Sequence, residues 1–171
     1  MGDDPTGKLQ RIKKTSRSSA HLPPRGIRRE RNGMRNIVTS YFATGLVFLA
    51  LDAVWLTLAA NAIYRPLLGP ILRDGFDLGA AAAFYFIYVA GMVFFAVRPG
   101  LLADSPFTAL VHGAALGFVA YATYDLTNQA TLKTWSTTVT LVDLAWGSVV
   151  TAAASGIGCF LTLRIGRMLD G

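Results

Sequence analysis

From residue 37 to residue 163 the chain alternates between four long apolar stretches and short polar links. The apolar stretches are Ile37–Tyr64, Gly79–Val97, Phe107–Leu126 and Thr138–Leu163. Each can cross about 30 Å of hydrocarbon as an α-helix, which rises about 1.5 Å per residue. Because lipid offers the backbone no hydrogen-bond partners, such stretches form helices rather than strands. The pattern therefore predicts an all-α fold, a polytopic bundle of four transmembrane helices over residues 36–168.

Prolines mark the ends of these stretches. All seven lie outside them: Pro66 and Pro70 follow the first stretch, and Pro99 and Pro106 border the link between the second and the third. Proline has no backbone N–H and interrupts a helix interior, so we expect the helices to end close to these positions.

The first 35 residues have a different composition. Met1–Arg35 is rich in Lys, Arg, Ser and Pro and has no apolar periodicity, which is typical of a disordered segment. This basic tail holds 10 of the 16 Lys and Arg residues of the chain. Met34 offers a second start, so the sequence leaves open whether residues 1–33 are natively translated.

The same basic residues predict the orientation. Lys and Arg gather on the cytoplasmic side of a membrane, so the N-terminus is expected there. Four spans return the C-terminus to that side, where Arg164 and Arg167 lie. Because the positive charge belongs to a tail and not to a folded face, we expect the lipid bilayer and its anionic lipids as partners, and no nucleic acid.

Composition agrees with a membrane protein. The chain is 53% hydrophobic and 15% charged, with a mean hydropathy of +0.43, which leaves too little polar surface for a soluble domain of 171 residues. Cys159, the single cysteine, lies inside an apolar stretch, which excludes an intrachain disulfide and a cysteine-cluster metal site.

Three aspartates interrupt the apolar stretches. Asp52, Asp125 and Asp143 should all lie in the outer half of the bundle, because successive spans alternate in direction. An aspartate near the centre of a span costs about 2.5–3.5 kcal/mol on insertion scales, so three of them require partners. The spans contain no Lys or Arg, which leaves Tyr, Trp, Thr, Asn and water.

Aromatic and amide side chains accompany the acids. Trp55 and Trp146 each follow an aspartate by three residues, a spacing that puts a carboxylate and an indole N–H on one helix face. An aromatic belt at the membrane interface is the alternative interpretation, above all for Tyr64 and Trp135. The candidate ligand-binding residues are Asp52, Trp55, Tyr64, Tyr121, Tyr124, Asp125, Asn128, Gln129, Trp135, Asp143 and Trp146.

Small residues continue the face of Asp143 along the fourth span. Gly147, Thr151 and Ser155 follow at steps of four, and the third span carries Gly113 and Gly117. Small residues let membrane helices approach closely, so this pattern favours a helix-packing seam; a narrow groove leading inward is the alternative. We expect no metal site, since His112 lies 13 residues, roughly 20 Å, along the helix from Asp125.

Several short motifs resemble the domain of unknown function 2177 family, short bacterial proteins of the inner membrane. They are Asp52–Leu56, Tyr64–Gly69, Phe84 and Tyr85, Tyr88 with Gly91, Tyr121–Lys133 and Val142–Gly147. The run around Asp125 is the most specific of them, and the resemblance covers about Met34–Ser155. It implies a multi-pass protein of the inner membrane and brings no established reaction, ligand or catalytic residue.

Three functional classes stay open. The first is a binding or transport protein whose outer acidic cluster holds or conducts a cation, a proton or a polar small molecule. The second is a membrane-embedded enzyme that acts on a lipid or isoprenoid, with one aspartate as general acid or base. The third is a non-catalytic accessory subunit. Four spans are few for a transporter, so transport would call for a homo-oligomer. No cofactor and no catalytic residue can be named from the sequence.

Overall fold

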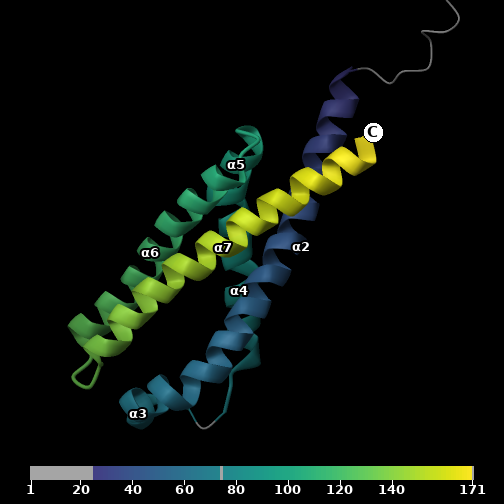
Figure 1. Ribbon diagram of the computed structural model, residues 1–171. Helices are drawn as coiled ribbons and strands as arrows, with labels where there is room; N and C mark the ends of the chain where they lie inside the picture. Colours follow the sequence, from purple (N-terminus) through teal and green to yellow (C-terminus); the bar gives the residue numbers. More distant parts are fainter. Residues whose placement is uncertain (1–24, 74, 171) are drawn as a thin grey trace, which may run out of the picture. The chain divides into compact units, whose positions relative to one another are not determined.

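The structure, a computed structural model, describes residues 25–73 and 75–170, with their side chains from residue 33 to residue 169 (Figure 1). All regular elements in this part of the chain are helical. They are α2 (Arg25–Ala59), the π-helical turn η1 (Ala60–Tyr64), α3 (Arg65–Leu68), the 3-10 turn η2 (Gly69–Ile71), α4 (Leu78–Met92), the π-helical turn η3 (Val93–Val97), α5 (Arg98–Leu102), α6 (Pro106–Thr131) and α7 (Thr137–Asp170).

Four continuous helical segments in the described residues are long and apolar enough to cross a membrane. They are Gly33–Ile71, Leu78–Leu102, Pro106–Thr131 and Thr137–Leu169. Their outer faces carry exposed large apolar side chains such as Leu46, Phe86 and Val119, which suits contact with lipid. The predicted all-α fold with four spanning helices is confirmed.

The chain divides into two units, Met1–Arg35 and Asn36–Gly171, and α2 begins in the first of them. The predicted disordered tail lies outside the described residues as far as residue 24. From Arg25 to Arg35 the backbone is helical, so the expected disorder is wrong for these residues. Arg and Glu are good helix formers, and no proline follows Pro24 before the first span, so the helix of the span extends toward the N-terminus.

The first two spans also continue through their prolines, whereas we expected them to end there. A π-helical turn comes shortly before the first proline of each span. The Arg65 N–H bonds to the Ala60 carbonyl, and the Arg98 N–H bonds to the Val93 carbonyl. Pro66 and Pro99 follow directly. A proline ring clashes with the carbonyl four residues earlier in an α-helix, and the wider π turn relieves that clash.

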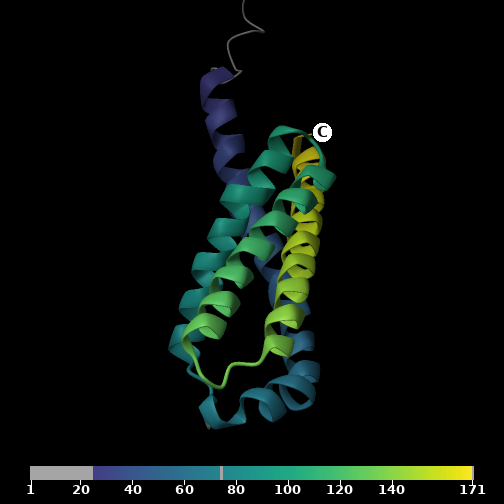
Figure 2. The same ribbon diagram turned by 90° about the vertical axis from the view of Figure 1, so that its left-hand side faces the viewer.

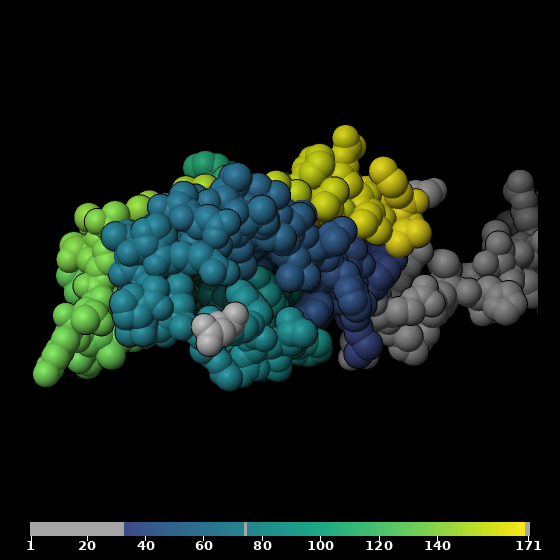
Figure 3. Space-filling model, turned by 90° about the horizontal axis from the view of Figure 1, so that it is seen from below, coloured from purple at the N-terminus to yellow at the C-terminus, as the bar shows by residue number. Residues whose placement is uncertain are grey.

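Within the second unit the helices alternate in direction (Figures 1 and 2). We call the end that carries α3 and the α6–α7 loop (residues 132–136) the α3 end, and the end with the α5–α6 turn the α5 end. The chain of α2 and α6 runs toward the α3 end, and that of α4 and α7 runs back. In the space-filling view from below, α2 and α3 lie between the α6–α7 loop on the left and the C-terminal part of α7 on the right (Figure 3).

Two apolar clusters hold the second unit together. The larger joins α2, α4 and α7 and consists of Phe48, Val89, Met92, Val150 and Ala154. The smaller lies toward the α5 end and consists of Val97, Ala109 and Cys159. Both are built from side chains with almost no exposed surface, so they exclude lipid from the interior.

The helices α6 and α7 approach each other through small residues. A Cβ atom added to Gly113 would lie 2.7 Å from the Thr151 carbonyl oxygen, and one added to Gly117 would lie 2.7 Å from Thr151 Oγ1. Ser155 lies against Gly113, and Gly147 lies against Gly117 and the ring of Tyr121. The five small residues singled out in the sequence therefore meet along one seam, which brings the polar parts of α6 and α7 together.

Candidate functional site

Three aspartates on three different helices lie inside the bundle. Asp125 is 0% exposed, and Asp52 and Asp143 are each 7% exposed. Asp52 lies seven residues before the end of α2, Asp125 six before the end of α6, and Asp143 six after the start of α7. All three are thus on the side of the α3 end, where alternating helix directions bring them to a similar level.

Tyrosine hydroxyls, and not cations, satisfy two of these acids. The Tyr85 hydroxyl donates to Asp52 Oδ2. The Tyr64 hydroxyl donates to Asp143 Oδ1 at 2.6 Å and accepts a hydrogen bond from Trp55 Nε1 at 3.0 Å. These bonds link α2 to α4 and η1 to α7, so they also tie helices together.

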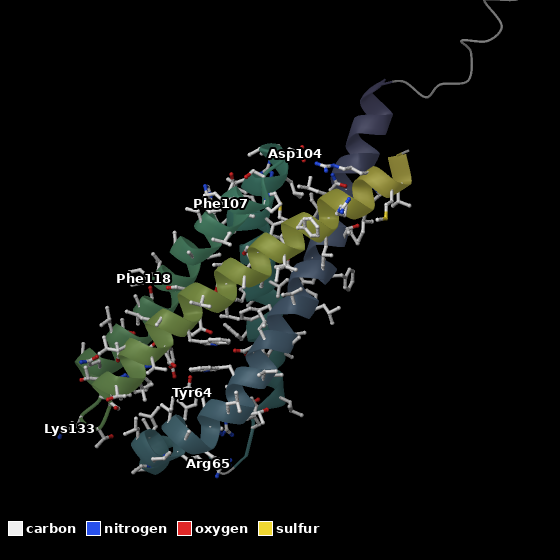
Figure 4. All side chains as sticks on the ribbon, viewed as in Figure 1. Tyr64, Arg65, Asp104, Phe107, Phe118 and Lys133 are labelled. Atoms are coloured by element: carbon white, nitrogen blue, oxygen red, sulfur yellow. The ribbon has the colours of Figure 1, made fainter. Side chains whose placement is uncertain are left out.

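The π turn η1 explains how Tyr64 reaches this position. Trp55 and Tyr64 are nine residues apart, which is about 2.5 turns of an α-helix at 3.6 residues per turn. On a regular helix the two side chains would therefore point to opposite faces. Tyr64 closes the π turn just before Pro66, and the altered geometry lets its hydroxyl bond to Trp55. Figure 4 shows Tyr64 on the segment that leads into α3.

Asp125 has no such partner. Both of its carboxylate oxygens are buried without a hydrogen bond, and so is Nε1 of Trp146. The Trp146 ring stacks on Trp55, with ring centroids 4.4 Å apart and planes 10° apart. The cluster therefore combines two satisfied acids with one free acceptor group and one free donor group.

The acids interact through space. Asp125 interacts electrostatically with Asp143, and Asp143 with Asp52. Tyr121 lies within electrostatic reach of both Asp52 and Asp143. We call this group the acidic–aromatic cluster: Asp52, Trp55, Tyr64, Tyr85, Tyr121, Asp125, Asp143 and Trp146. In the described part of the chain, no three His, Cys, Asp or Glu side chains are placed to hold one metal ion.

No cation pairs with the cluster among the described residues. The ion pairs there join Arg73 to Asp77 and Arg167 to Asp104, all four exposed. Arg65 follows Tyr64 directly but is exposed and forms no salt bridge with the three aspartates. The three carboxyl groups of the cluster, whether ionised or protonated, therefore have no Lys or Arg partner among the described residues.

Four sequence candidates form no hydrogen bond to the three carboxylates, although Tyr124 lies within electrostatic reach of Asp125 and Asp143. Trp135 Nε1 donates to Thr140 Oγ1 at 3.0 Å, and Gln129 Nε2 donates to Thr137 Oγ1 at 3.1 Å. Tyr124 is largely exposed and meets the edge of the Trp135 ring. The backbone carbonyl of Asn128 ends α6 by accepting from the Leu132 N–H. These side chains surround the α6–α7 loop, where they hold its two helices in place.

Two tyrosines were missed as site residues. Besides the bond from Tyr85 to Asp52, the Tyr88 hydroxyl shares a hydrogen bond of 2.9 Å with Thr151 Oγ1. Both lie in the second span, which has no charged residue, and the sequence pointed to them only as part of the family resemblance. The available signal was that Tyr85 and Tyr88 carry the only side-chain hydroxyl groups between Gly79 and Val97, three residues apart on one helix face.

Comparison with known families covers most of the described chain. A family model described as "Predicted membrane protein (DUF2177)" matches residues 37–160. The chain belongs to the DUF2177 family. The matched range contains all three aspartates and every aromatic residue of the acidic–aromatic cluster, so the cluster lies in the part of the chain that defines membership of DUF2177. No curated protein and no solved structure matches the chain.

Proposed function

We propose that this DUF2177 protein binds a small cation at the acidic–aromatic cluster, and that it serves in the binding or transport of that cation. The observation that carries the proposal is Asp125, a fully buried carboxyl group whose two oxygens have no hydrogen-bond donor. Asp143 adds to the negative potential around it, and Asp52 acts on Asp143 in turn.

The physical argument compares Asp125 with its neighbours. A charged side chain at membrane depth costs about 2.5–3.5 kcal/mol on insertion scales, and such residues are retained mainly at functional positions. Asp52 and Asp143 recover part of this cost through tyrosine hydroxyls. Asp125 recovers none of it within the described residues, and a bound cation would supply both a hydrogen-bond donor and the opposite charge.

The proposal includes a location and an orientation. We place the protein in a bacterial inner membrane with both termini in the cytoplasm, because of the basic tail and of Arg164 and Arg167. The α3 end then faces outward, so a cation would enter the cluster from outside the cell. Anionic lipids on the cytoplasmic face would attract the basic tail.

An accessory role is the second candidate, and the hydrogen bonds of Tyr85 and Tyr64 favour it. Each bond joins two helices, as a purely structural contact would. The two functions differ in what they require of Asp125, which takes part in no such bond. A purely structural role does not explain why a buried carboxyl group without a hydrogen bond is present at this position.

The test is ligand-dependent stabilisation of the purified protein in detergent. Melting temperature would be measured at constant ionic strength with inorganic monovalent cations, small protonated amines and a neutral polyol. We expect at least one cation to raise the melting temperature, because it binds only the folded state. Asp125→Asn should remove that rise, and Asp104→Asn, which alters an exposed carboxylate at the α5 end, should keep it. No stabilisation by any cation would contradict the proposal.

A further inference from the structure

Two buried groups of the cluster lack partners and are of opposite kinds. The Asp125 carboxylate can only accept hydrogen bonds, and the Trp146 indole N–H can only donate one. They belong to α6 and α7, and neither satisfies the other. A molecule between them would therefore have to present a donor to one and an acceptor to the other.

The two groups lie on the same side of one contact between α6 and α7, the side toward the α3 end. Gly147, the neighbour of Trp146, lies against the ring of Tyr121. Tyr121 is one helical turn before Asp125 on the same face of α6. Asp143, one turn before Gly147 on α7, interacts electrostatically with Asp125. The free acceptor, Asp125 on α6, and the free donor, Trp146 on α7, thus lie next to the contact between Tyr121 and Gly147.

The direction of the Trp146 N–H is held by its surroundings. Its ring is stacked on Trp55, whose own N–H is bonded to the Tyr64 hydroxyl, which in turn is bonded to Asp143. Every other polar group in this chain of contacts already has a partner. Because the donor is fixed before any ligand arrives, little ordering is needed on binding.

The chemistry of the site narrows the kind of cation. Within the described residues no three ligating side chains converge as a metal ion requires. A protonated amine needs only one carboxylate, because its N–H groups bond to both oxygens directly. The free indole N–H then calls for a hydroxyl or carbonyl oxygen on the same molecule.

We infer that the acidic–aromatic cluster takes a small protonated amine that also carries a hydrogen-bond acceptor, with the ammonium group at Asp125 and the acceptor at the N–H of Trp146. This inference rests on the proposed function and deepens it. An amino alcohol is the simplest molecule of this class.

The experiment measures affinities of the full chain in detergent by titration calorimetry. The probes are ethanolamine, ethylamine, tetramethylammonium, ethylene glycol and sodium. One hydrogen bond contributes about 0.5–1.5 kcal/mol, so ethanolamine should bind roughly 2–10-fold more tightly than ethylamine. Tetramethylammonium has no N–H and ethylene glycol no charge, so neither should compete.

Variants separate the two halves of the site. Trp146→Phe keeps an aromatic ring but removes the N–H, so it should bring ethanolamine down to the affinity of ethylamine and leave ethylamine unchanged. The matched control is Trp135→Phe, which removes an indole N–H bonded to Thr140 outside the cluster and should change neither affinity. Asp125→Asn should abolish the binding of both amines, and the probe series on the unaltered chain needs no variant to fold.

The outcomes separate this inference from the proposed function. Binding of sodium without amines, equal binding of ethanolamine and ethylamine, or full competition by tetramethylammonium would overturn the inference and leave a cation site. Absence of binding by every probe would overturn both.

Discussion

The two ends of the bundle treat their acidic side chains in opposite ways. At the α5 end, Asp104 accepts two hydrogen bonds from Arg167 at 3.0 and 3.1 Å, and both side chains are more than half exposed. On the side of the α3 end, Asp52, Asp125 and Asp143 are buried. Asp52 and Asp143 accept hydrogen bonds from tyrosine hydroxyls, and Asp125 accepts none. An exposed pair contributes little to stability, whereas a buried acid without a cation is expensive. The buried acids near the α3 end are therefore the better candidates for a functional role.

The largest expected effect concerns the sidedness of the two ends. Cysteines introduced at Ala130 and Asp104 should be labelled by a membrane-impermeant thiol reagent from opposite sides of intact cells, Ala130 from outside. Ala130 lies at the end of α6, and Asp104 lies in the α5–α6 turn. Figure 4 shows Asp104 and Lys133, which follows shortly after α6, at opposite ends of the bundle. Labelling of both from one side would contradict four spans, and labelling of Asp104 alone from outside would reverse the orientation.

Replacing the free acid by an apolar side chain should stabilise the fold. Asp125→Leu removes a buried group without partners, and exchanges of buried ionic groups for apolar ones gain about 1–4 kcal/mol. The free energy of unfolding, measured by denaturation in detergent without ligand, should therefore rise while cation binding disappears. Asp143→Leu is the matched change at an acid that has a donor, and its stability should fall instead, because Tyr64 loses its acceptor. A loss of stability in Asp125→Leu would show that the carboxyl group has a structural partner.

The Tyr64 hydroxyl should matter next. Tyr64→Phe leaves Asp143 Oδ1 and Trp55 Nε1 without their shared partner, and each buried group left unsatisfied costs about 1–3 kcal/mol. The same denaturation measurement should show this loss. Tyr41→Phe removes a hydroxyl that donates to the Phe86 carbonyl at an exposed position, and the smaller loss expected there serves as the control. Equal losses in the two variants would mean that burial adds nothing to the bond of Tyr64.

The smallest effect is expected at the α5 end. Asp104→Asn breaks an exposed ion pair, so stability should fall by less than about 1 kcal/mol, and the difference should vanish at high salt. Arg167→Gln should have the same effect, and the double variant should lose no more than either single one. A salt-independent loss larger than that of Tyr64→Phe would remove the contrast between the two ends.

The fold was predictable from the sequence because hydrophobic length alone decides how many helices cross a bilayer. The four apolar stretches correspond to the four helical segments, and the helices only extend further at their ends. The ends were harder, because Pro66 and Pro99 interrupt an α-helix but not one that widens into a π turn. Hydrophobicity carries no information about such a turn.

The site was predictable only in part. Asp52, Asp125 and Asp143 are conspicuous because acids are rare in spans, and alternating helix directions suggest a common level. The partner of Asp52 was not foreseen, because Tyr85 is a tyrosine in an otherwise apolar helix and only tertiary packing turns its hydroxyl inward. Trp135 and Gln129 were taken for neighbours of the acids because they are near in sequence, yet their hydrogen bonds close the α6–α7 loop.

The π turn η1 has a consequence for how the gene can change. A π turn holds one residue more than the α-helical turn that would replace it, so it amounts to a single inserted codon. Deleting one residue between Ala60 and Ile63 would leave an apolar span of nearly the same length, and the protein would still insert. The Tyr64 hydroxyl, however, would rotate away from Trp55 and Asp143. Among related genes, a one-codon gap at this place would therefore mark a lineage that has lost the cluster but kept the membrane protein.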